Sequence, residues 1–208
     1  MAKRLVLLDF RLTGMVTDGI GEVIRVGAGT DIQKAFNKIA VRAFGVGGLD
    51  DLLICCHGFE DVVEDFDGQV SFMSGGFGLQ LCAENLTLAN VGVTAVLKAD
   101  PPLVPLVKRI VVFSCAAADT HRASKAVGAD GMRLMGGIAL TTGARVVAST
   151  ATQLYRLIPG VAQSLRSAGG KDDWRIDFGE WEGAVFEFSP NDGVGRKLKP
   201  EQHPRFAF

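Results

Sequence analysis

The sequence has little net charge and no long apolar run. It carries 22 Lys and Arg residues against 23 Asp and Glu residues, and its formal net charge of -1 comes without a basic block. Recognition of a phosphate backbone depends on clustered Lys and Arg, so we expect no nucleic-acid partner. No apolar stretch approaches the roughly 20 residues that cross a bilayer. Asp9 interrupts the first apolar run, and no small-residue cleavage site follows. We therefore expect no membrane partner and a cytoplasmic location.

Cysteine and histidine are also scarce. The chain has four cysteines, at positions 55, 56, 82 and 115, and three histidines. The cysteine spacing matches neither a paired C-x-x-C zinc pattern nor a dense disulfide framework, which favours a reduced protein. GAGT at 27–30 lacks the third glycine and the lysine of phosphate loops, so a nucleotide-binding domain is not favoured. We expect no metal and no cofactor.

Short apolar stretches alternate with stretches of helical periodicity. The predicted strands lie at 5–8, 22–26, 52–56, 108–115, 145–150 and 183–190, with two short strands around Gly75-Gly76 within 69–81. The predicted helices lie at 31–44, 85–100, 120–142 and 152–170. This alternation indicates an α/β fold with three layers, a mostly parallel central sheet and helices on both faces. The length favours a single domain over 1–190, followed by an irregular C-terminal tail over 191–208.

Two local patterns add detail to this outline. Thr30 and Gln33 match a capping box, so the first helix is expected to begin at Asp31. The stretch 59–69 is acidic and is expected to be a solvated loop. The alternative for this stretch is a calcium site or a lid, but the spacing matches no EF-hand.

His57 and Cys115 each follow the last apolar residue of a predicted buried strand. Ligands bind at the carboxyl ends of parallel strands, so both side chains are expected at the same edge of the sheet. A thiol acts as a nucleophile when it ionises, which a nearby imidazole and the N-terminus of the helix predicted near Thr120 would both favour. Gly58 lets backbone approach a substrate closely, and its N–H is a candidate oxyanion donor.

Several blocks of the sequence resemble a known family. LLICCHG at 52–58 and RIVVFSC at 109–115 resemble the paired signature of the caspase-like (clan CD) cysteine peptidases, in which one hydrophobic strand ends in His-Gly and another in Cys. GGFGLQLCAENLTLANV and TTGARVVAST are similar to CHAT-type domains and to a related bacterial domain of unknown function. The likeness covers about residues 5–150. The caspase motif Gln-Ala-Cys-x-Gly is absent, and the chain reads FSCAAAD in its place.

The resemblance implies a caspase-like α/β domain with His57 as the catalytic histidine and Cys115 as the nucleophile. It also implies an oxyanion hole formed by the N–H groups of Gly58 and Cys115. The function expected from it is that of a cysteine endopeptidase that cleaves peptide or protein substrates through an acyl-enzyme. The alternative is a catalytically inactive caspase-like module that serves binding or assembly.

A peptidase would also need a substrate pocket beside its nucleophile. Asp119, Ser149 and Thr150 are the candidates for this pocket, and Asp119 would favour a basic P1 residue unless it only marks a helix start. The last predicted strand, at 183–190, is a candidate for joining two copies through an edge strand, or it simply closes the sheet.

Each catalytic candidate has a structural explanation as well. His57 can be a hydrogen-bonded histidine that closes a strand, and Cys115 a small buried hydrophobe. Cys55 shares a strand face with His57, which permits a metal pair, but core packing is expected for the three cysteines other than Cys115. His121 is a rival base, although a histidine at that place is expected to be exposed at a helix start. The accessibility and reactivity of Cys115 separate the two functions.

Overall fold

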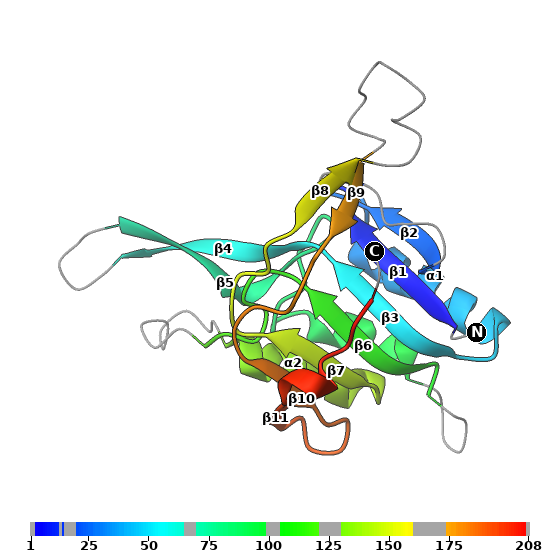
Figure 1. Ribbon diagram of the computed structural model, residues 1–208. Helices are drawn as coiled ribbons and strands as arrows, with labels where there is room; N and C mark the ends of the chain where they lie inside the picture. The colour runs from blue at the N-terminus through cyan, green and yellow to red at the C-terminus, as the bar shows by residue number, and fades with distance from the viewer. Residues whose placement is uncertain are drawn as a thin grey trace.

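A seven-stranded sheet forms the centre of the protein, shown as a computed structural model in Figure 1. The structure describes residues 3–12, 14, 20–64, 70–98, 105–120, 130–159 and 174–206. The sheet strands are β1 (Arg4–Asp9), β2 (Glu22–Val26), β3 (Leu49–Cys55), β6 (Val107–Phe113), β7 (Arg145–Ser149), β10 (Val185–Phe188) and β11 (Gly195–Lys197). They lie in the order β11-β10-β7-β6-β3-β1-β2. The five strands from β7 to β2 are parallel, and β10 pairs antiparallel with both β7 and β11. The predicted α/β class with a mostly parallel sheet is confirmed.

The central strands are apolar on both faces because each face packs against a separate core. Along β3, Leu52 and Ile54 belong to one cluster of buried side chains, whereas Leu53 and Cys55 belong to the other. Successive side chains of a strand point to opposite faces, so a continuous apolar run is what a doubly covered strand requires. Fully burying one Leu or Ile contributes about 1.5–3 kcal/mol, which makes these strands the main source of stability.

Three helices of the described residues pack on one face of the sheet. They are α1 (Ile32–Gly45), α2 (Gly131–Thr142) and the 3-10 helix η1 (Val91–Leu97), whereas the short 3-10 helix η5 (Pro200–Gln202) has no buried residue. Phe36 and Ile39 of α1 lie in the same buried cluster as Ile138 of α2 and Leu97 of η1. Among these residues, therefore, helices on both faces are not found, and the predicted three-layer arrangement is not confirmed.

Strand β9 (Trp174–Asp177) and the C-terminal segment cover the other face. The ring of Phe113 stacks on Phe178 at 4.7 Å and on Trp181 at 4.9 Å, measured between ring centroids, and Phe206 meets it edge-on at 6.0 Å. Ile176 of β9 is fully buried in the same cluster. Aromatic side chains thus occupy the place where a second helical layer was expected.

Two hairpins replace segments predicted otherwise. Residues 59–64 of the acidic stretch expected as a loop belong to β4 (His57–Glu64), which pairs with one continuous strand, β5 (Val70–Gln80), instead of two short ones; residues 65–69 lie outside the described residues. The described part of the predicted helix at 152–170 contains no helix but β8 (Arg156–Pro159), which pairs with β9 (Trp174–Asp177), and residues 160–170 lie outside the described ones. Antiparallel partners satisfy the backbone of these segments, so their local composition did not decide their structure.

The two other predicted helices also differ in extent. The segment at 85–100 forms η1 rather than an α-helix, and α2 covers only the second half of 120–142, its residues 121–129 lying outside the described ones. None of the described helices is long and apolar enough to cross a membrane.

The C-terminal segment, expected to be irregular, contains β11 and the short 3-10 helix η5 (Pro200–Gln202). β11 pairs with β10 on the side opposite to β7. The strand at 183–190 is therefore not an edge strand within this chain, and pairing of two copies through it would require β11 to leave. Beyond η5, Pro204 accepts a hydrogen bond from the indole N–H of Trp181 at 2.8 Å.

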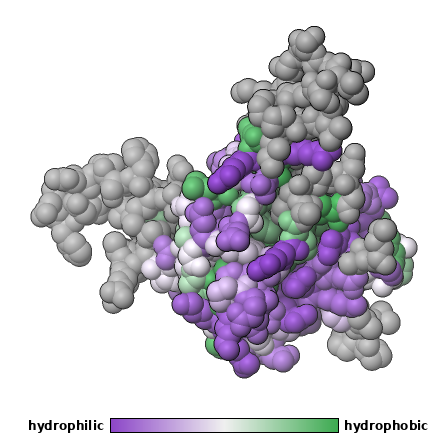
Figure 2. Space-filling model, viewed as in Figure 1, coloured by the Kyte–Doolittle hydropathy of each residue, from purple (hydrophilic) through white to green (hydrophobic). Residues whose placement is uncertain are grey.

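The surface of the described residues is mostly hydrophilic in the view of Figure 2, where apolar residues form small separate groups. Val41 and Phe44 of α1 and Leu154 are among the large apolar side chains that remain exposed. Scattered apolar side chains of this kind are normal on a folded protein.

The start of α1 differs by one residue from the capping box expected. Asp31 is the N-cap, and its carboxylate accepts a hydrogen bond from the N–H of Lys34 at 2.8 Å. The hydroxyl of Thr30 instead accepts from the N–H of Gly27 at 3.1 Å. A carboxylate at the N-cap also interacts favourably with the helix dipole, which explains why it takes this place.

This cap gives a first prediction. Asp31→Ala should lower the free energy of unfolding by about 1 kcal/mol, because one N–H of the first helical turn loses its partner. Gln33→Ala, which would break the expected capping box, should change it by less than about 0.5 kcal/mol. Urea unfolding of the two variants measures both values. Equal losses in the two variants would contradict the cap at Asp31.

Candidate active site

His57 and Cys115 lie just beyond the ends of two paired strands. The parallel register of β3 and β6 ends with Cys55 opposite Phe113, joined by a hydrogen bond from the N–H of Cys56 to the carbonyl of Phe113 at 3.2 Å. His57 and Cys115 are each two residues beyond this last pair, His57 after Cys55 and Cys115 after Phe113. Paired strands run about 4.8 Å apart, so the two residues leave the sheet side by side at its carboxyl edge.

Gly58 lies directly against the backbone of Cys115. A Cβ atom added at Gly58 would lie 2.5 Å from the carbonyl oxygen of Cys115 and 3.1 Å from its Cβ. No real side chain tolerates the shorter distance, so the contact requires glycine. The His-Gly dipeptide is therefore held beside the predicted nucleophile by backbone packing.

The N–H of Gly58 points away from the hairpin partner β5. Gly58 is paired with Leu79, but the N–H and C=O of Leu79 both bond Leu86, each at 2.9 Å. In an antiparallel ladder, the N–H and C=O of a residue point to the same side of its strand. Leu79 therefore directs both groups to Leu86 and forms a non-hydrogen-bonded pair with Gly58. In a regular ladder this pairing leaves the N–H of Gly58 on the side of β4 opposite to Leu79.

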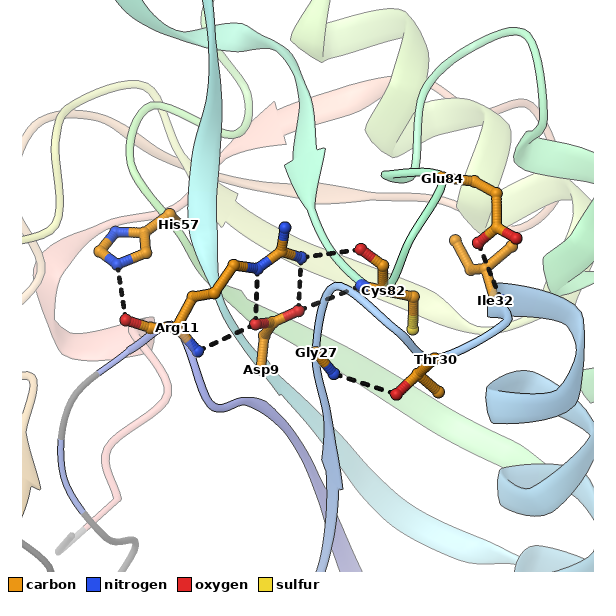
Figure 3. A network of polar contacts seen from close by, with 8 residues as sticks. All are labelled: Asp9, Arg11, Gly27, Thr30, Ile32, His57, Cys82 and Glu84. Atoms are coloured by element: carbon orange, nitrogen blue, oxygen red, sulfur yellow. Dashed lines mark hydrogen bonds and ion pairs between the residues drawn. The ribbon is translucent and has the colours of Figure 1, made fainter.

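The half-buried ring of His57 is oriented by a backbone carbonyl (Figure 3). Its Nε2 lies 3.3 Å from the carbonyl oxygen of Arg11. A carbonyl can only accept, so this hydrogen bond requires the proton on Nε2 and leaves Nδ1 as the unprotonated nitrogen of the neutral ring. The free nitrogen is then the one that can act as a base.

Cys115 is the only one of the four cysteines that is not buried. Burial raises the pKa of Cys56 and of Cys82 to about 12, and that of Cys55 well above its ordinary value. These three thiols stay protonated and inaccessible at neutral pH. Among the four cysteines, Cys115 is therefore the candidate nucleophile.

The turn that carries Cys115 is tightly held. Ala116 has a left-handed backbone, with φ at 45°, which costs energy in a residue other than glycine. Its N–H donates to the carbonyl of Ala151 at 2.9 Å, and its carbonyl accepts from the N–H of Gly76 at 2.9 Å. The N–H of Ala118 donates to Ser149 at the end of β7. This fixed turn presents Cys115 at the edge of the sheet.

Among the described residues, no helix begins directly after Cys115. Residues 115–118 form a turn, and α2 begins at Gly131, capped by Asp130, which accepts from the N–H of Arg133 at 3.0 Å. Residues 121–129, which include the rival base His121, lie outside the described residues. Among the described residues, no helix N-terminus therefore supports ionisation of Cys115.

The predicted pocket residues hold the sheet edge together. Ser149 is fully buried, and its hydroxyl donates to the carbonyl of Glu182. Thr150 and Ala184 bond each other through the Thr150 hydroxyl and backbone. Asp119 is half-buried, and its side chain accepts from the N–H of Thr120 at 2.9 Å. Ser149 thus has no surface to offer a substrate.

A cavity that the sequence did not suggest opens at the same rim. It measures about 570 Å³ and is lined among others by Leu154, Trp181 and Glu182. Gly183, next to Glu182, packs against Ala151, whose carbonyl receives the N–H of the Cys115 turn. The sequence around Trp181 gave no signal of this cavity, because the ring of Trp181 packs on Phe113 at the edge of the core.

No protein-family model, curated protein or solved structure matches the chain. The part of the chain that the structure describes contains no group of three or more His, Cys, Asp or Glu residues able to hold a metal ion. The chemistry of the site has to be argued from its own residues.

The contact at Gly58 gives a second prediction. Gly58→Ala should lower the free energy of unfolding by roughly 1–3 kcal/mol, because the new methyl group must displace the carbonyl of Cys115. Gly29→Ala is the matched control, since nothing lies within 4 Å of a Cβ there. Its effect should stay within about 0.5 kcal/mol. Chemical denaturation compares the two, and a Gly58→Ala protein as stable as the control would refute the close approach.

Proposed function

We propose that the protein is a cysteine endopeptidase of the caspase-like type, with His57 and Cys115 as its catalytic dyad. The observation that carries this proposal is the contact of Gly58 with the backbone of Cys115, which brings the two halves of the resembling motif to one point. The mostly parallel sheet, with both residues at the carboxyl edge, agrees with the caspase-like arrangement that the motif implies.

The parts support an acyl-transfer reaction. Cys115 passes its thiol proton to Nδ1 of His57, and the thiolate attacks the carbonyl carbon of the scissile peptide bond. The new C–S bond leaves an oxyanion, which the N–H groups of Gly58 and Cys115 stabilise. When the C–N bond breaks, Nδ1–H protonates the leaving amine. A water molecule, deprotonated by His57, then hydrolyses the thioester and regenerates the thiol.

One observation favours the alternative, an inactive caspase-like module used for binding or assembly. Within the described residues, the ring of His57 is bonded to the carbonyl of Arg11 through Nε2, and no hydrogen bond joins the ring to the sulfur of Cys115. Without that hydrogen bond, the thiol lacks the direct contact with a base that activates a cysteine nucleophile. The reactivity of Cys115 therefore decides between the two functions.

Thiol labelling is the direct test. At neutral pH, iodoacetamide should modify Cys115 and none of the buried cysteines, as located by mass spectrometry of the digested protein. His57→Ala should slow this labelling by about tenfold or more, because the thiolate loses its base and counter-ion. His203→Ala, which changes a histidine of the C-terminal segment, is the control and should leave the rate unchanged. Labelling of Cys82 alone, or of no cysteine, would favour the inactive module.

Peptide hydrolysis tests the reaction itself. A mixture of peptides incubated with the protein should be cleaved, and Cys115→Ala and His57→Ala should each reduce the rate by at least about 10³-fold. The two losses should not add in the double variant, because the residues act as one unit. Cleavage that survives in Cys115→Ala would mean that another group, or a contaminant, does the chemistry.

A further inference from the structure

Asp9 is a fully buried carboxylate at the last position of β1. Arg11, two residues later, binds it with both arms of its guanidinium, Nε donating to Oδ1 at 2.8 Å and Nη2 to Oδ2 at 2.6 Å. The backbone N–H of Arg11 donates to the same carboxylate at 3.0 Å. These three hydrogen bonds fix the turn after β1 at both its side chain and its backbone.

The pair also reaches the loop that follows β5. Arg11 Nη2 donates to the carbonyl of Cys82 at 2.9 Å, and the N–H of Cys82 donates to Asp9 at 3.1 Å. Two residues further on, Glu84 accepts from the N–H of Ile32 at the start of α1 at 3.0 Å. Figure 3 shows the contacts that run from His57 through Arg11 and Asp9 to Cys82, and separately the contact of Glu84 with Ile32 at the start of α1.

The network reaches the candidate active site through the backbone carbonyl of Arg11, whose oxygen lies 3.3 Å from Nε2 of His57. The side chain of Arg11 is tied to Asp9 and Cys82, while its carbonyl is directed to the imidazole, so the position of the carbonyl depends on the ion pair. Asp9 acts on the histidine through Arg11 without touching it (Figure 3).

We infer that Asp9 and Arg11 are positioning residues for His57: their ion pair, whose carboxylate is buried, holds the Arg11 carbonyl against Nε2–H and so keeps Nδ1 free to take the proton of Cys115. This inference rests on the proposed function. It gives the ion pair a role beyond the stability of the fold. Burying a carboxylate costs desolvation free energy, and the pairing often returns little net stability.

A second buried pair on the same sheet provides the comparison. Asp51 of β3 is 3 % exposed and binds Arg4 at 3.1 Å and Arg109 at 2.6 Å. It stands near the start of its strand, whereas Asp9 stands at the end of its own, so the two pairs lie toward opposite edges of the parallel sheet. Neutralising either aspartate removes a comparable buried charge, but only Asp9 is connected to His57.

The experiment compares Asp9→Asn with Asp51→Asn in the full chain. In each variant a neutral amide replaces the carboxylate at nearly the same side-chain volume, which abolishes the ion pair, and the new NH2 faces a donor that bound the carboxylate. Two quantities are measured at one neutral pH: the ¹⁵N signals of the His57 ring and the rate at which iodoacetamide labels Cys115. His57→Ala assigns the ring signals and gives the labelling rate without the base.

In the wild type and in Asp51→Asn, the His57 ring should show one protonated and one bare nitrogen. In Asp9→Asn, the two signals should move toward each other as the ring exchanges its tautomers, and labelling of Cys115 should slow by about 10- to 100-fold, the usual effect of a misplaced catalytic group. Arg11→Lys, which keeps a cation beside Asp9 but loses the forked contact, should give a smaller change in the same direction.

The outcomes separate the inference from the proposed function. If His57→Ala slows labelling but Asp9→Asn and Arg11→Lys leave both the ring signals and the rate as in the wild type, the positioning role is overturned and the dyad stands. If Asp51→Asn slows labelling as much as Asp9→Asn, the effect is one of general stability, and the inference is again overturned. If wild-type Cys115 is unreactive, the proposed function fails first. If Asp9→Asn does not fold, Arg11→Lys decides by the same two measurements.

Discussion

The site depends on the parallel pairing of β3 with β6. This pairing sets Cys55 opposite Phe113, and the residues that follow the two strands leave the sheet side by side. His57 and Cys115 therefore stand on neighbouring segments at one edge of the sheet. The two segments stay close because residue 58 has no side chain to hold them apart, and the Cys115 carbonyl occupies the space that a Cβ would fill. The pairing of two apolar strands thus determines where the residues of the proposed dyad stand.

Each neighbouring strand adds one part at the same edge. β1 ends in Asp9, which places the Arg11 carbonyl beside His57, and β7 ends at Ser149, which bonds the turn of Cys115 through its carbonyl. Parallel strands bring their carboxyl ends to one side, so residues far apart in sequence converge there by topology alone. The strain at Ala116 is tolerated because hydrogen bonds on both sides over-determine the turn.

The sequence predicted the parts whose stability is local or uniformly apolar. The strands around Leu52 and Val111 were readable because doubly covered strands need continuous apolar runs. β4 and β8 were not, since their backbones are satisfied by partners that lie elsewhere in the chain. The helix cap moved from Thr30 to Asp31 because both residues can cap, and the surrounding contacts, not the motif, chose between them.

The same distinction applies within the site. The positions of His57 and Cys115 at the edge of the sheet could be predicted because each follows an apolar run, which is a property of the sequence around it. Asp9 and Arg11 gave no such signal, since an aspartate and an arginine after a strand are ordinary in a turn. What sets them apart is that the carboxylate is fully buried and that a carbonyl 46 positions from His57 is aimed at its ring. Burying a charge costs free energy that pairing alone seldom returns, so the pair has its clearest explanation in the orientation it gives to the histidine.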